Sequence, residues 1–359
     1  MRDMILGRWT GLWIAVLLIA VVFITLGGCD GESENEKPTS NETPSTIIPP
    51  TDTSSVLPAT AEILFTSNQD TGTSRWEIYS MDLQGGNITR ITDSNENHFI
   101  FGIDPSRRYI AATRGTEEQK RLWLLDLETG EETPLTDAEN HAEGRTFSLD
   151  GEWVVFWMVP AGETLADIYK VKRDGTGLTN LTNTPHANEG DPAWSHRGDK
   201  IAFCYNDGNP NRFVLKSMDT DGNNARTIYD PEDSVATAIF PPGVMDPSWS
   251  PDDEWILVDK PVQFTGDGEN AYAGIWRIIK IRADGSEVVD LTGSGEHANS
   301  AVYLPSFSPD GDSIVFTSRY GPEDASSVSL NIFKMDRNGG SLEQLTDTPH
   351  WDQFAVWIR

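Results

Sequence analysis

Five of the six histidines occupy a recurrent position in the chain. Each follows a short Leu/Ile-Thr pattern by four to six residues: His98, His141, His186, His297 and His350. Carboxylates lie near them in the sequence, at Asp104, Glu143, Glu189, Asp191, Asp246 and Asp352. Imidazole and carboxylate groups are common ligands of first-row divalent metals. The residue types therefore raise the hypothesis of a site for a metal ion or a cationic ligand, carried by a repeated fold.

The Leu/Ile-Thr pattern marks six copies of one unit. Its copies are Ile91-Thr92, Leu135-Thr136, Leu181-Thr182, Leu291-Thr292 and Leu345-Thr346, with a degenerate copy at Ile228-Tyr229. Successive copies are 44 to 63 residues apart. This spacing is typical of one four-stranded propeller blade with its loops.

The third unit shows the four strands most clearly. Asp150-Gly151 and Asp174-Gly175 separate apolar runs, and Asp-Gly favours the positive φ angles of tight hairpin turns. The expected strands, called a to d, are residues 145–148, 153–157, 167–171 and 178–182.

Strand a ends on the same pattern in several units. A large aromatic residue precedes a serine that opens a tight turn, as in Trp249-Ser250-Pro251-Asp252. The aromatic residues are Phe147, Trp194, Trp249 and Phe307. We interpret them as packing residues between neighbouring blades rather than as ligand contacts.

The propeller region neither begins nor ends at the boundary of a complete unit. Residues 354–359 read as a strand a, and residues 62–66 read as a strand b without a strand a before it. Pairing these two segments completes a sixth blade and removes two exposed strand edges. The sequence therefore predicts an all-β fold, a six-bladed β-propeller whose ring is closed by the C-terminal strand.

These motifs resemble the repeat of the TolB-type propeller. The resemblance rests on Asp191-Pro192-Ala193-Trp194-Ser195, on residues 247–252 and 305–316, and on Asp167-Ile168-Tyr169 and residues 331–336. It covers residues 61–359 and implies a WD-repeat-like propeller. Such blades also occur in periplasmic scaffolds, in peptidases and in pectin-fragment lyases, and the resemblance implies no single function. The α/β domain that precedes the propeller in TolB has no expected counterpart, so the role of TolB is not transferred.

The repeat places the five histidines on one face of the propeller. Connections from strand d to the next strand a emerge there together with the b–c loops, so the candidate channel-mouth site comprises the five histidines with Glu189, Asp191 and Asp352. Pectin-fragment lyases of this propeller type bind a metal through channel histidines, so the resemblance supports the metal hypothesis. A metal ion, however, needs its ligands at about 2.0–2.2 Å, and histidines on different blades of a six-fold ring are expected to lie far apart. The other interpretation is a repeat-encoded loop residue that hydrogen-bonds backbone.

Motifs of catalysis are missing from the sequence. It contains no Gly-x-Ser-x-Gly, no His-Glu-x-x-His and no phosphate-binding glycine loop. Asp219–Asn223 resembles the start of a calcium loop but lacks the closing glutamate and coincides with a c–d turn. Cys204 falls in a predicted strand and is expected to be a small buried residue. We therefore expect a protein that is not an enzyme and has no cofactor, a divalent cation being the alternative.

The first sixty residues indicate export. Residues 12–26 are uninterruptedly apolar after Arg2 and Arg8, and they lead into Leu26-Gly27-Gly28-Cys29, which resembles a bacterial lipobox. An uncleaved anchor helix is the other interpretation, although the apolar stretch is short of the roughly 20 residues that span a bilayer. We expect a signal peptide over 1–28, a lipidated Cys29 and a disordered Ser/Thr/Pro/Glu tether to residue 60.

The net charge of the chain limits the kinds of partner that it can bind. The whole chain carries −29, residues 1–28 contribute +1 and residues 30–60 contribute −5, which leaves −25 on residues 61–359. Such a domain repels phosphate, so nucleic acid is excluded and the membrane contact is expected through the lipid anchor alone.

The sequence thus predicts a monomeric lipoprotein facing the periplasm or the cell exterior, whose propeller binds a protein or another cell-envelope component. The alternative is a metal-dependent carbohydrate-active enzyme that uses the histidines at the channel mouth.

Substitution of Cys29 tests the predicted anchor. Cys29→Ser removes the thiol that would accept the lipid, so we expect the protein to leave the membrane fraction or to accumulate as an unprocessed precursor. Intact-mass measurement of the wild-type protein checks this, and a mature form without an added lipid mass would contradict the anchor.

Overall fold

The computed structural model describes residues 56–69, 75–116, 119–209, 211–236, 241–264, 274–295, 297–319 and 329–358. The predicted signal peptide, Cys29 and residues 30–55 of the predicted tether lie outside these ranges. Within them, no helix has the length and apolar character needed to cross a bilayer.

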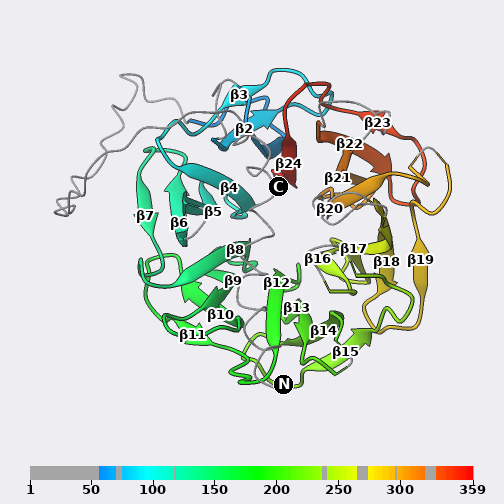
Figure 1. The fold of residues 1–359 in the computed structure, drawn as a ribbon. Helices are drawn as coiled ribbons and strands as arrows, with labels where there is room; N and C mark the ends of the chain where they lie inside the picture. Colours follow the sequence, from blue (N-terminus) through cyan, green and yellow to red (C-terminus); the bar gives the residue numbers. More distant parts are fainter. Residues whose placement is uncertain are drawn as a thin grey trace, which may run out of the picture.

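Twenty-four strands form six four-stranded antiparallel sheets in the described ranges, arranged as blades around one axis (Figure 1). Blade one contains β24 (Asp352–Trp357), β1 (Ile63–Ser67), β2 (Glu77–Met81) and β3 (Thr89–Arg90); blade two contains β4 (Asn97–Ile103), β5 (Tyr109–Thr116), β6 (Gln119–Asp126) and β7 (Glu132–Pro134). Blade three contains β8 (His141–Phe147), β9 (Trp153–Val159), β10 (Asp167–Lys172) and β11 (Thr179–Asn180); blade four contains β12 (Asn188–Trp194), β13 (Lys200–Asn206), β14 (Val214–Asp219) and β15 (Arg226–Tyr229). Blade five contains β16 (Met245–Trp249), β17 (Trp255–Phe264), β18 (Gly274–Arg282) and β19 (Val288–Asp290); blade six contains β20 (Ala301–Phe307), β21 (Ser313–Arg319), β22 (Asn331–Asp336) and β23 (Glu343–Gln344). The predicted fold is confirmed.

Ring closure follows the predicted pairing. β24 pairs antiparallel with β1, with Ile63 opposite Trp357 and Ser67 opposite Asp352. The inner strands β4, β8, β12, β16, β20 and β24 face the axis, and the short strands β3, β7, β11, β15, β19 and β23 form the periphery (Figure 1). Blade one is therefore built from both ends of the propeller.

The Leu/Ile-Thr pattern has a structural role in each blade that carries it. The threonine hydroxyl accepts a hydrogen bond from the backbone N–H of strand c, at 2.9 Å from Ile78 to Thr92 and at 2.9 Å from Ile332 to Thr346. Leu135, Leu181 and Leu345 of the pattern are buried. Strand d is short and offers no backbone acceptor to this N–H group of strand c. The threonine hydroxyl supplies that acceptor, so the pattern joins the outer strand to its blade.

The turns between strands a and b share one hydrogen-bond arrangement. The Ser250 hydroxyl donates to Asp252 at 2.6 Å and accepts from the backbone N–H of Trp255 at 2.9 Å. Ser148 and Ser308 make the same two contacts with their own turns. Because these bonds lie within the turn, the turn is set by local sequence.

The aromatic residues before these serines pack between blades, as predicted. Trp249 is 5% exposed, and its indole Nε1 donates to the Ala193 carbonyl of the preceding blade at 3.0 Å. Trp357 makes the equivalent bond to the Ser306 carbonyl at 3.1 Å. These contacts tie blade five to blade four and blade one to blade six.

The described chain reaches the propeller before the predicted start at residue 61. Leu57 is buried in a core cluster with Leu127, and the backbone N–H of Val56 donates to the Leu127 carbonyl at 2.8 Å. Residues 56–60 therefore pack onto blade two.

Removal of residues 354–359 tests the closure. Without most of β24, blade one loses its inner strand and two strand edges become exposed, so we expect loss of the cooperative thermal unfolding transition. Trp357→Phe, which keeps β24 and removes the indole hydrogen bond together with part of the buried ring, should retain that transition with a loss of about 1–3 kcal/mol of unfolding free energy. A truncated protein that melts like the wild type would contradict the closed ring.

Candidate functional site

A β-bulge interrupts each inner strand near its middle. In four inner strands a residue at the bulge has a positive φ: 52° for Asp191 and Asp246, 56° for Leu304 and 57° for Phe354. Leucine and phenylalanine adopt this conformation rarely, at a cost of about 1–3 kcal/mol, so the surrounding packing must hold it. In β4 and β8 the bulge carries Phe101 and Arg145 instead. We call these six residues the central ring: Phe101, Arg145, Asp191, Asp246, Leu304 and Phe354.

Contacts around the ring show that its members meet near the axis. The Arg145 guanidinium pairs with Asp191 of the next blade and, at 2.6 Å, with Asp246 of the blade after that. The guanidinium also lies 5.0 Å from the centre of the Phe101 ring, which is 5.1 Å from that of Phe354. Since Arg145 reaches Asp246 across blade four, side chains of three adjacent blades meet at the level of the bulges.

A third carboxyl group lies behind this pair of ion pairs. Asp259 of β17 is 1% exposed, and its Oδ2 accepts a hydrogen bond from the Leu304 backbone N–H at 3.0 Å. Burial raises the pKa of Asp259 well above its ordinary value, and the neighbouring Asp246 raises it further. Burial likewise raises the pKa of Asp191 to about 6, in spite of the nearby Arg145. Two aspartates thus share one guanidinium, and a third carboxyl group is hydrogen-bonded to Asp246.

A cavity of about 130 Å³ lies on one side of the central ring. Its walls come from the C-terminal halves of the inner strands, with Phe147, Trp249 and Phe307 among the lining residues. Arg145 and Asp246 of the central ring also line it. Pro105 and His196, from two a–b turns, place the cavity on the face that carries the a–b and c–d turns, which we call the turn face. The opposite face, with the b–c and d–a connections, is the connection face.

The predicted histidines lie toward the connection face and do not converge. His98 is buried between blades one and two. The ring of His141 is tilted against that of Trp157 with 5.4 Å between ring centres, and the ring centre of His297 lies 5.3 Å from that of Phe316. His186 is exposed and His350 is half-buried. No three His, Cys, Asp or Glu side chains among the described residues are grouped as a metal site would need.

The predicted carboxylates are also distributed. Glu189 accepts from the Thr184 hydroxyl at 2.9 Å, and burial raises its pKa to about 7. Asp352 accepts from Ser67 at 2.5 Å and from Thr348 at 2.9 Å. Of the eight residues predicted at the channel mouth, Asp191 alone belongs to the central ring.

Sequence reasoning did not identify Arg145 or Phe101 as axial residues. A usable signal was the column two to three residues before the aromatic–serine pair, where Asp191-Pro192, Asp246-Pro247 and Leu304-Pro305 align.

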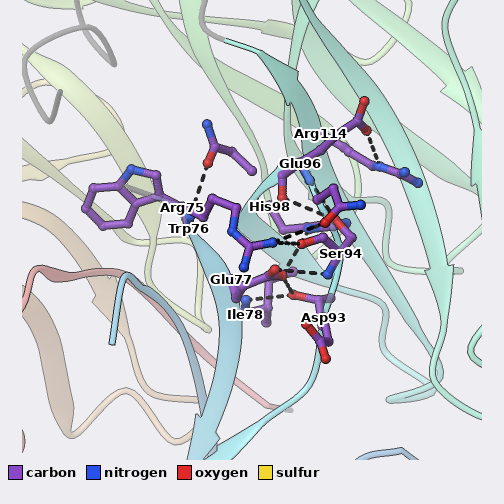
Figure 2. A network of polar contacts seen from close by, with 12 residues as sticks. Arg75, Trp76, Glu77, Ile78, Asp93, Ser94, Glu96, His98 and Arg114 are labelled. Atoms are coloured by element: carbon purple, nitrogen blue, oxygen red, sulfur yellow. Dashed lines mark hydrogen bonds and ion pairs between the residues drawn. The ribbon is translucent and has the colours of Figure 1, made fainter. Parts of the chain in front are cut away.

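Among the predicted histidines, His98 lies in the most extensive polar network (Figure 2). Its Nδ1 lies 3.2 Å from Glu77 and its Nε2 lies 3.1 Å from Glu132, and the imidazole side chain is 2% exposed. Arg114 pairs with both Glu96 and Glu132 at the edge of this network. Burial disfavours the charged imidazole, but hydrogen bonds to Glu132 and Glu77 and their charges outweigh it and raise the pKa of His98 to about 9. The network therefore connects blades one and two with a buried charged pair.

Solved structures with the same architecture include TolB from Acinetobacter baumannii, with a TM-score of 0.63 and 18% identity over 83% of this chain and 66% of that one. A putative TolB from Agrobacterium tumefaciens has a TM-score of 0.56 and 17% identity, covering 83% of this chain and 98% of that chain. The fold is that of the TolB-like propellers. Hydrazine synthase from Kuenenia stuttgartiensis also matches, with a TM-score of 0.62 and 12% identity over 84% of this chain and 47% of that one. One architecture thus occurs in proteins of different activity.

The relatives found by sequence match only part of this chain. An uncharacterized protein of Agrobacterium fabrum is 28% identical over 190 residues, covering 50% of this chain and 61% of that protein. The uncharacterized peptidase YuxL of Bacillus subtilis is 29% identical over 172 residues, covering 40% of this chain and 24% of that protein. The chain therefore spans less than two thirds of either relative. No protein-family model matches it.

Titration of His98 gives a pH test of the inter-blade network. The folded-state pKa of about 9 exceeds the ordinary value of 6.5, so the stabilisation is complete below about pH 6.5 and is lost as the pH rises through 9. The size is on the order of 3 kcal/mol, at about 1.4 kcal/mol per pKa unit. Chemical unfolding between pH 6 and 10 should show a steeper loss of stability for the wild type than for His98→Gln.

The exposed His186 provides the matched control. His186→Gln should follow the wild-type pH dependence. Parallel curves for the wild type and His98→Gln would mean that His98 is not charged in the folded protein.

Proposed function

We propose that this protein is an exported, membrane-tethered scaffold that binds a protein partner with the turn face of its propeller. The turn-face cavity carries this proposal. It is lined by residues of the central ring and by aromatic side chains, and it contains a few polar groups, the composition typical of binding sites. The predicted lipobox at Cys29 and the acidic charge of the domain agree with an extracytoplasmic tether.

The size of the cavity favours a macromolecular partner over a small molecule. Pockets for small ligands usually measure about 300–1,000 Å³, and this cavity has about 130 Å³. That space suits one side chain of a partner whose surrounding surface rests on the turns. Interfaces commonly depend on such central anchors in well-packed pockets.

The alternative of a metal-dependent carbohydrate-active enzyme gains no support from the arrangement of the histidines. Stoichiometric divalent metal that survives dialysis of the full protein, and is lost in a His186→Ala/His350→Ala double variant, would favour the enzyme.

Site-specific photocrosslinking in cells tests the binding face. A photoreactive phenylalanine at Leu149, an exposed residue of a turn-face a–b turn, should give one discrete protein adduct. Ser248→Phe, which fills the cavity from its wall, should abolish the adduct. Ser286→Phe, on an exposed c–d turn, should leave it unchanged. An adduct that persists in folded Ser248→Phe would contradict docking at the cavity.

A further inference from the structure

We infer that the turn-face cavity takes a single cationic side chain, a lysine or an arginine, presented by the protein partner. The inference rests on the proposed function and specifies the chemistry of the group that anchors the partner. It is carried by the charge arrangement at the base of the cavity and by the aromatic walls.

Charge is unbalanced at the base of the cavity. Asp191 and Asp246 both pair with the single guanidinium of Arg145, and Asp246 also lines the cavity. The nearby Glu143 has its own cation, because its Oε1 lies 3.4 Å from Lys120 Nζ. A cation entering the cavity would therefore meet two aspartates that are balanced by one guanidinium, and partial burial strengthens the Coulomb attraction between the cation and Asp246.

The walls suit the rest of such a side chain. Lysine and arginine carry an apolar stem that packs on apolar surface, and their cations are attracted to aromatic faces within about 6 Å. The base of the cavity already contains this interaction, because the Arg145 guanidinium lies 5.0 Å from the centre of the Phe101 ring. A second cation between Trp249 and Phe307 would be held by the same forces.

An anionic anchor fits less well. Arg145 uses Nη1 for Asp246 and Nη2 for Asp191, which leaves its Nε without a partner among the described residues, and a carboxylate ligand on Nε would lie beside both aspartates. The chain carries a net charge of −29, which repels acidic partners and steers basic ones toward it.

Side-chain analogues test the inference on the wild-type protein. The full chain in detergent is titrated with n-butylguanidinium, n-butylammonium, pentan-1-ol and valerate, and binding is followed by the indole N–H signals of Trp249 and Trp357. We expect both cations to shift these signals saturably and to bind at least about tenfold more tightly than the alcohol, with valerate weakest. Equal binding of cations and alcohol, or tighter binding of valerate, would overturn the inference.

Two variants localise the effect. Asp246→Asn removes the charge that lines the cavity at nearly constant shape, and it should weaken the binding of n-butylguanidinium about tenfold or more. Asp284→Asn, on an exposed turn of the same face, should leave the affinity unchanged. If Asp246→Asn does not fold, the discrimination among the four analogues on the wild-type protein still decides the question.

The crosslinking experiment separates this inference from the proposed function. A Leu149 adduct that is lost in Ser248→Phe but retained in folded Asp246→Asn would support the binding face and overturn the cationic anchor. Loss of the adduct in both variants, with Asp284→Asn unaffected, is the result expected here.

Discussion

Pairing of β24 with β1 is the constraint on which the rest of the structure depends. Blade one exists only because Trp357 and Asp352 of one end lie opposite Ile63 and Ser67 of the other. Closure removes the free edges that an open array of blades would expose. It also makes six inner strands converge on one axis, and this convergence brings together side chains that are remote in sequence, such as Arg145 and Asp246.

The bulges place a ring of side chains near the axis. A regular inner strand would alternate its side chains between the two faces of its blade, whereas the bulge redirects one residue of each strand toward the axis. The result is a ring whose apolar part, Phe101 with Phe354 and Leu304, lies beside a charged part formed by Arg145, Asp191 and Asp246. Buried charges are costly to desolvate, and such pairs add little net stability compared with apolar packing. Their position at the base of the turn-face cavity is consistent with a role in binding.

The two faces of the propeller differ because short-range hydrogen bonds fix the loops of the turn face and do not fix those of the connection face. On the turn face, serine and aspartate side chains form the turns by short-range hydrogen bonds, so the blades resemble one another. On the connection face, a similar distance from the Leu/Ile-Thr pattern does not produce a constant environment. β4 and β8 begin early enough to include His98 and His141, but β12, β20 and β24 begin after His186, His297 and His350. Offsets of six and four residues thus yield a buried ion pair at His98 and an exposed side chain at His186.

The sequence by itself determined the features that depend on neighbours within one blade: the number of units, the four strands, the serine turns, the packing of Trp249 and the split blade. These features follow from periodicity and from short-range hydrogen bonds, and both can be recognised in the sequence. Only the tertiary structure decided what lies at the axis. Arg145 meets Asp191 and Asp246 through strand convergence and through bulge geometry, and neither leaves a composition signal. The histidine pattern was visible in the sequence, but whether its members gather around one point depends on the diameter of the ring and on the start of each inner strand. The structure separates them and brings together instead the charged and aromatic residues at the bulges of the inner strands.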